Sequence, residues 1–156
     1  MIGWSLQRIL GLALLLLSVA TEPATADTAS DHKIVSNVAI YLGLIPAEMI
    51  RGHPPRATES TMHGGSPAGQ GQYHVTIALF DATTGKRITG ADVRARVAEI
   101  GLSGEEKKLE PMDIAGTETY GNYFPMVGSG PFRINVTVRI TGQRGEIKAA
   151  FEHRHR

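Results

Sequence analysis

Short segments in which apolar and polar residues alternate constrain the fold of this chain more than any other feature of its sequence. The clearest is Phe132–Ile140, where apolar and polar residues alternate without a break. In Tyr73–Asp81, one set of side chains is again apolar at every second position. A period of two residues places successive side chains on opposite faces of a β-strand. These segments therefore predict strands with one buried face, and no stretch carries the period of an amphipathic helix.

Further segments of the same kind predict a fold built from strands alone. They lie at Lys33–Leu44, Ala91–Val97, Lys107–Ile114, Tyr123–Val127 and 147–151. Glycine, proline and aspartate turns separate them, whereas the polar run 115–122 is expected to be a loop. About seven strands at a spacing of roughly 8–12 residues are typical of an immunoglobulin-like antiparallel β-sandwich. Such a sandwich, as a single all-β domain over residues 27–156, is the predicted fold.

The N-terminal segment has the pattern of a secretory signal peptide. Arg8 precedes an apolar run over residues 9–19, and Ala24-Thr25-Ala26 provides small residues in the spacing of a cleavage site. The run is shorter than the roughly 20 apolar residues of a spanning helix. Residues 1–26 are therefore predicted to be a signal peptide cut after Ala26, which directs the chain to the periplasm or outside the cell. Retention of the segment as an uncleaved anchor is the alternative.

Composition narrows the function further. The formal net charge is +1 and no block of basic residues is present, so a nucleic acid is not an expected partner. Motifs for nucleophilic hydrolases, phosphate-binding loops and zinc proteases are also missing, and we expect no enzymatic activity. Because the chain has no cysteine, a soft metal ligand would have to be methionine, and a nitrogen ligand histidine.

Histidine and methionine residues gather in and around one long segment that lacks hydrophobic periodicity. This segment, residues 51–72, is rich in glycine and proline. Loops of such length are uncommon in compact domains and are usually functional or disordered. The candidate metal ligands are the histidines and methionines of this loop, the histidine that opens the following strand, and two methionines in short strands: His53, Met62, His63, His74, Met112 and Met126.

This mixture of ligand types favours copper. Imidazole binds Cu(II) and Zn(II) well, and thioether sulfur prefers Cu(I). The expected arrangement is a rigid strand end at His74 with the loop folded over one sheet edge, which brings His63, with Met62, near His53 and His74. Each of these residues also has a plain structural interpretation, as a solvated loop residue or as core packing.

Two other features allow different interpretations. His153 and His155 are two residues apart on one strand face, a spacing that can chelate a metal, but they are expected to lie in a disordered C-terminus. The local aromatic group from Tyr120 to Phe124 could form a recognition patch, for example for a carbohydrate, or belong to the core.

Turn and strand motifs in the second half of the chain resemble those of small exported domains of the YtkA-like and FixH-like type. The motifs are Leu79–Ile88 followed by Ala91–Val93, and later Gly121–Tyr123 and Gly130–Val136. They cover about Tyr73–Ile140. The resemblance implies an exported β-sandwich of a kind found near copper handling and respiratory-oxidase assembly, and it implies no fixed ligand set.

Taken together, the sequence predicts an exported, non-enzymatic β-sandwich protein that binds copper for transport or delivery. A periplasmic or membrane protein would then be its partner. The first alternative is a metal-free module that docks a partner protein through the loop or a sheet edge. A carbohydrate-binding or enzyme accessory domain is the second.

Overall fold

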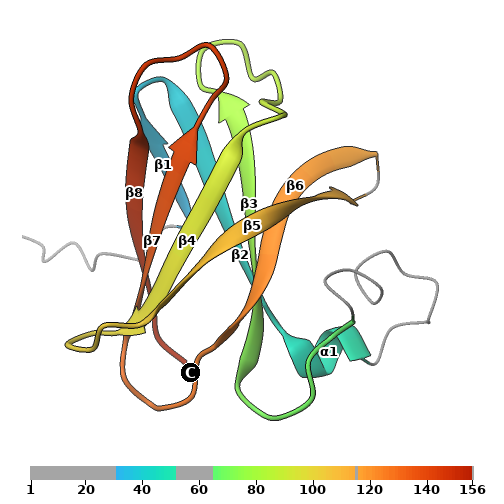
Figure 1. The fold of residues 1–156 in the computed structure, drawn as a ribbon, viewed down its shortest axis with the longest axis vertical. Helices are drawn as coiled ribbons and strands as arrows, with labels where there is room; N and C mark the ends of the chain where they lie inside the picture. The colour runs from blue at the N-terminus through green and yellow to red at the C-terminus, as the bar shows by residue number, and fades with distance from the viewer. Residues whose placement is uncertain (1–30, 52–64, 115, 156) are drawn as a thin grey trace, which may run out of the picture.

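The computed structural model describes residues 31–51, 65–114 and 116–155, and within them the chain forms one antiparallel sheet of eight strands with one short helix (Figure 1). The elements in chain order are β1 (His32–Val35), β2 (Val38–Pro46), α1 (Ala47–Arg51), β3 (Gln72–Asp81), β4 (Asp92–Glu99), β5 (Glu105–Ile114), β6 (Thr117–Pro125), β7 (Phe132–Arg139) and β8 (Ile147–His153). The predicted all-β antiparallel class is confirmed. The predicted signal peptide, residues 1–26, lies outside the described residues and stays a prediction.

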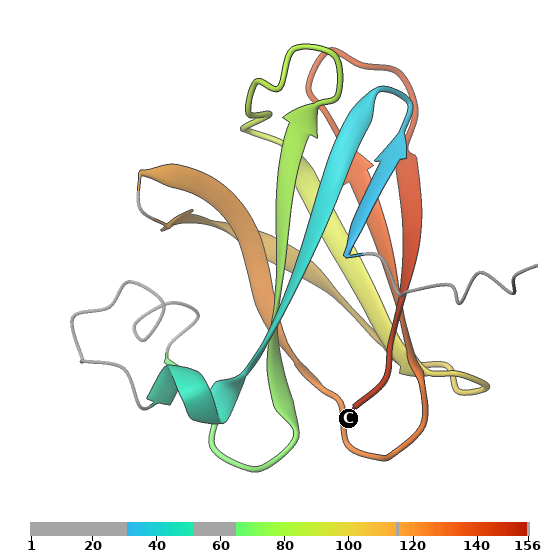
Figure 2. The ribbon, with the colours of Figure 1, turned by 180° about the vertical axis from the view of Figure 1, so that it is seen from behind.

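The sheet curls into a nearly closed barrel whose strand order is β1-β2-β3-β6-β5-β4-β7-β8. Strand β5 makes the corner, because Glu105–Leu109 pair with β4 while Glu110–Ile114 pair with β6. The two ends of the order, β1 and β8, lie side by side in both views (Figures 1 and 2). Across this seam the Lys33 ammonium lies 5.7 Å from the centroid of the Phe151 ring. A single continuous sheet thus replaces the expected pair of separate sheets.

The main core fills the inside of this curled sheet. Val75, Ile77 and Leu79 of β3 face inward and are fully buried, as the alternation in this segment predicts. Ile134 and Val136 of β7 face them from the opposite wall, with the same period of two. Full burial of such a side chain contributes roughly 1.5–3 kcal/mol.

Three local expectations were wrong, and the first two concern where strands begin and end. The expected first strand, Lys33–Leu44, is a hairpin, since Ser36 and Asn37 both adopt positive φ angles, 49° and 64°. Two consecutive residues of that kind form the tight turn that suits the twist of paired strands. The expected polar loop 115–122 belongs mostly to β6, which begins at Thr117 and pairs with β5.

The third wrong expectation is the disordered C-terminus. β8 continues to His153, and the His155 ring is held by the ends of two other segments. Its Nε2 donates to the Met126 carbonyl at 3.1 Å, because a carbonyl can only accept, and its Nδ1 lies 3.1 Å from the Tyr73 hydroxyl oxygen, within hydrogen-bond distance.

Candidate metal centre

The outer face of β3 and β6 is unusual because polar side chains are buried on it. His74 is 0% exposed, Thr76 9% and Thr119 7%, although all three point away from the main core. Helix α1 packs on this face, where Ala47 and Ile50 form a second small apolar cluster with Tyr123. Figures 1 and 2 show α1 and the projecting β5–β6 hairpin on the same side of the molecule, so that they flank this part of the sheet.

Gly121, near the centre of β6, allows two side chains of this face to approach the backbone closely. Its row neighbours are Thr76 on β3 and Glu110 on β5. A Cβ atom at Gly121 would stand 2.7 Å from Nε2 of His74 and 2.9 Å from Sδ of Met112. Two candidate ligands therefore converge over Gly121, where a side chain would overlap both of them, and their donor atoms are no farther apart than the sum of these distances. We call this group of three residues, His74, Gly121 and Met112, the cradle.

The strand register explains why these residues meet. His74 pairs with Tyr123, and Met112 pairs with Thr119, which places both ligands on the outer face on opposite sides of Gly121. A metal held by one imidazole nitrogen and one sulfur needs its donors at about 2.0 and 2.3 Å. Nε2 of His74 and Sδ of Met112 both lie over the Cα of Gly121, and a metal bound by the two would have to lie farther from this glycine than a Cβ atom does.

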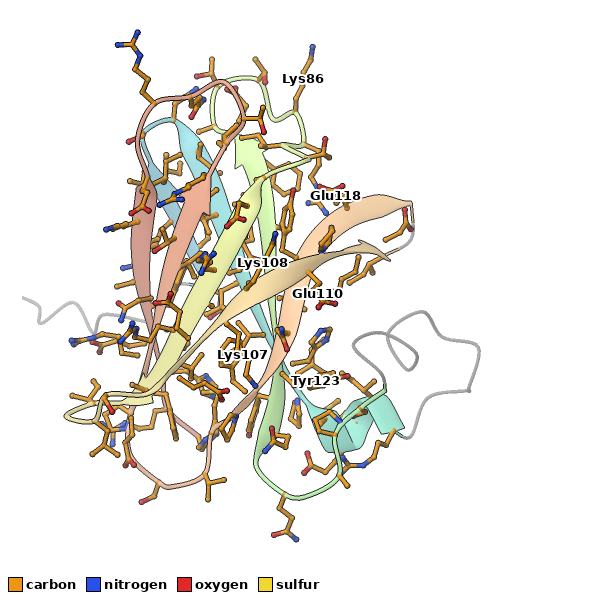
Figure 3. All side chains as sticks on the ribbon, in the orientation of Figure 1. Lys86, Lys107, Lys108, Glu110, Glu118 and Tyr123 are labelled. Carbon is orange, nitrogen blue, oxygen red and sulfur yellow. The ribbon has the colours of Figure 1, made fainter. Side chains whose placement is uncertain are left out.

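Aromatic stacking fixes the plane of the His74 ring. The Tyr123 ring lies parallel to it, with centroids 4.6 Å apart and an interplanar angle of 24°. Tyr123 is itself 5% exposed and backed by Ile50 of α1. Lys107 donates to the Tyr123 carbonyl at 2.8 Å, which ties this strand to β5 (Figure 3). The packed Tyr123 ring thus holds the His74 ring in place beside Gly121.

Both ends of the predicted ligand loop are fastened beside α1. The Arg51 guanidinium donates to the carbonyl oxygens of Pro67 at 2.5 Å and of Gly69 at 3.5 Å. The Ser66 hydroxyl donates to the Ala47 carbonyl at 3.1 Å. The described ends of the loop therefore lie next to α1, which packs against Tyr123.

The predicted ligands divide into three groups. His74 and Met112 come together at the cradle. Met126 packs in the main core, and neither His74 nor Met112 belongs to that core. The other three predicted ligands lie outside the described residues and stay predictions: His53, Met62 and His63. No group of three or more His, Cys, Asp or Glu side chains able to hold a metal occurs within residues 31–51, 65–114 and 116–155.

Sequence reasoning did not identify Gly121, Glu110 or the stacking role of Tyr123. Glu110 projects from β5 at the rim of the cradle, and its side chain is exposed (Figure 3). Only the pairing of β6 with β3 and β5 brings these residues to the two ligands. Gly121 and Tyr123 are two residues apart, so the sequence does place them on the same face of a strand. That fact points to the two ligands only once the strand register is known.

A network of polar groups at the other end of β6 serves the fold. The Tyr120 hydroxyl donates to Glu118 at 2.5 Å and accepts from the Ala91 amide at 2.9 Å. Burial, and then the bond to Glu118, raises the pKa of Tyr120 to about 12. The same hydrogen bond, followed by one from the Gly90 amide, lowers the pKa of Glu118 below its ordinary value. These bonds tie the loop before β4 to β6.

The two C-terminal histidines line a separate cavity of about 610 Å³, together with Asp31 and Tyr73. The His153 and His155 rings are 5.2 Å apart between centroids. Burial, and then the neighbouring His155, lowers the pKa of His153. Both nitrogens of His155 already take part in hydrogen bonds, so this pair is not arranged as an open chelating site.

The aromatic group from Tyr120 to Phe124 does not form a surface platform. Tyr120, Tyr123 and Phe124 are 1%, 5% and 0% exposed. Stacking of a sugar needs an accessible ring face, which none of the three presents. As for membrane association, no helix in the described part of the chain is both long and apolar enough to cross a bilayer.

Comparison with known proteins identifies the fold and no family. No family model matches the chain, and no curated protein matches it. Among solved structures, it is similar to a copper-bound variant, in which one glutamate is replaced by glutamine, and to an as-isolated form of FetP from uropathogenic Escherichia coli strain F11, each with 12% identity and a TM-score of 0.59. The matches cover 81% of this chain and 95% and 93% of the two FetP chains. A DUF4426 family protein from Pseudomonas aeruginosa PAO1 is similar to the same extent, with 12% identity, a TM-score of 0.60 and coverage of 81% and 94%.

Proposed function

We propose that this chain is an exported copper-binding β-domain that carries copper or delivers it to a partner protein. The observation that carries the proposal is the cradle, where Nε2 of His74 and Sδ of Met112 converge over the Cα of Gly121. An imidazole and a thioether on one point suit copper better than calcium, magnesium or manganese, which prefer oxygen ligands. The copper-bound state of FetP, which shares the fold, supports the same metal.

In this proposal the described residues have distinct roles. His74 and Met112 supply donor atoms, Tyr123 keeps the imidazole in its plane, and Gly121, which has no side chain, lets the two ligands approach each other. His53, Met62 and His63 are proposed as further ligands from the loop whose ends are fastened beside α1. The resemblance to YtkA-like and FixH-like domains, and the leader pattern at residues 1–26, support export. Copper binding needs no catalytic group, in keeping with the proposed absence of an enzymatic activity.

The test is the thermal stability of the purified chain with copper, measured once under reducing conditions and once under oxidising conditions. A ligand that binds only the folded state at 100 times its Kd stabilises it by about 2.7 kcal/mol. We expect Met112→Leu to remove the copper-induced rise in Tm, since leucine keeps the volume but lacks the sulfur. His74→Ala should remove it as well.

Met126→Leu is the matched control, because Met126 is a buried methionine of the main core. It should keep the full copper response. Loss of the response in both methionine variants would show that packing matters and not the sulfur at the cradle. No response of the parent chain to copper in either oxidation state would refute the proposal and leave the metal-free interaction module.

A further inference from the structure

The cradle combines neutral donors with strong burial, and this combination bears on the charge of the ion it can hold. A thioether and a neutral imidazole bring no negative charge to a bound cation. His74 is 0% exposed and Met112 5%, and the apolar residues Ala47 and Ile50 stand behind Tyr123. A cation in the cradle therefore loses hydration without gaining a counter-charge from these two ligands.

The free energy of burying an ion depends steeply on its charge. In the Born description it grows with the square of the charge, so a divalent ion costs about four times as much as a monovalent ion of equal size. Neutral donors do not offset that difference. Sulfur ligands add a preference in the same direction, because soft thioethers favour Cu(I) over divalent borderline ions.

Glu110 is the carboxylate that the register places beside the cradle, as the direct partner of Gly121. Its side chain is exposed, so it faces water at the rim, while Met112 on the same strand is buried. A carboxylate at the rim attracts cations of either charge toward the opening and does not by itself make the buried donors suitable for a divalent ion.

We propose that the cradle selects a monovalent soft cation, Cu(I) and its redox-inert analogue Ag(I), over Cu(II) and Zn(II). This inference rests on the proposed copper-binding function and specifies its substrate: the ion is bound and released in the reduced state. The selectivity comes from the Met112 sulfur and from the burial of His74, and Glu110 acts at the rim and not as a required ligand.

The test compares Ag(I), Cu(I), Cu(II) and Zn(II) on the full chain, with affinity measured by competition against a chelator of known affinity for each ion. We expect Ag(I) and Cu(I) to bind more tightly than Zn(II) and Cu(II) by more than about tenfold. Met112→Leu should reduce the Ag(I) affinity by more than about tenfold, and Met126→Leu should leave it unchanged. Glu110→Gln should change it by less than about twofold, because the carboxylate is not a required ligand.

Two results would overturn the inference while leaving copper binding intact. One is a Zn(II) or Cu(II) affinity equal to that for Ag(I) and still dependent on His74. The other is a loss of Ag(I) affinity of more than about tenfold in Glu110→Gln, which would make the carboxylate a ligand. Absence of binding for all four ions would refute the copper-binding function itself.

Discussion

The two faces of β3 are both buried, and the difference between them separates what stabilises this fold from what gives it a function. The inner face presents Val75, Ile77 and Leu79 to an apolar core. The outer face presents His74 and Thr76, and it is covered by α1 and the Tyr123 ring. Burial of apolar groups stabilises a fold, whereas burial of polar groups costs free energy unless they find partners. The buried polar side chains of the outer face therefore favour a role in ligand binding over a role in stability.

The largest expected effect contrasts one residue from each face. Ile77→Ala, on the inner face, should lower the free energy of unfolding by about 2–5 kcal/mol, because it removes buried methyl groups and leaves a cavity. Met112→Leu, on the outer face, should lower it by less than about 1.5 kcal/mol. Chemical denaturation with and without copper measures both quantities for each variant.

Copper should affect these two variants differently. Ile77→Ala should keep the stability increment that copper provides, and Met112→Leu should lose it. If Ile77→Ala also abolished the increment while the protein remained folded, stability and metal binding would not be separable between the two faces.

An effect of medium size is expected at Tyr120, whose ring lies in the main core and whose hydroxyl belongs to the polar network around Glu118. Tyr120→Phe removes the hydroxyl that serves Glu118 and the Ala91 amide, and should cost about 1–3 kcal/mol at pH 7. Tyr41→Phe is the control, since the Tyr41 ring is exposed and its hydroxyl should contribute less than about 0.5 kcal/mol.

The same variant should also change the response to acid. The pKa of Glu118 is lowered in the folded state, chiefly by Tyr120, so its contribution is present above the ordinary pKa of 4.5 and is lost as the pH falls through the lower folded value. Tyr120→Phe should therefore lose less stability than the parent chain between pH 5 and the acid limit, as followed by denaturation at each pH. An unchanged acid profile would show that the bond to Tyr120 does not control the ionisation of Glu118.

The smallest effect is expected at the β1–β2 turn, which lies outside both the inner and the outer face of β3. Ser36 has a φ of 49°, a conformation that costs residues with a Cβ roughly 1 kcal/mol. Ser36→Gly should stabilise the protein by up to about 1 kcal/mol, seen as a higher urea midpoint with an unchanged copper increment. Asn37→Gly should gain less, because it loses hydrogen bonds to Asp81 and Thr83. A lower midpoint for Ser36→Gly would show that the Ser36 side chain stabilises the turn.

The inner face could be predicted from the sequence because apolar and polar residues alternate along its strands, and the apolar ones face the core. Phe132–Ile140 and Tyr73–Asp81 each contain one of the observed strands, β7 and β3, almost at its full length. The hairpin at Ser36 was missed because neither turn residue is glycine, the usual sign of such a turn. The early start of β6 was missed because its first residues are polar and pair at an exposed hairpin.

The cradle could be predicted only in part. His74 and Met112 were both candidate ligands by residue type, but nothing in the local sequence indicated that they share a site while Met126 does not. That distinction depends on β6 lying between β3 and β5, with Gly121 in the middle. Strand order and register are set by long-range pairing, which a local pattern does not contain.

The most direct test of the cradle is copper binding by two glycine variants on the same face. Gly43 and Gly121 flank Thr76 on its two sides. A Cβ at Gly43 would contact the Thr76 hydroxyl, whereas one at Gly121 would contact His74 and Met112. We predict that Gly121→Ala abolishes the copper-induced rise in Tm and that Gly43→Ala, at whatever cost in stability, retains it. A Gly121→Ala protein that is folded and still binds copper as the parent chain does would contradict the account.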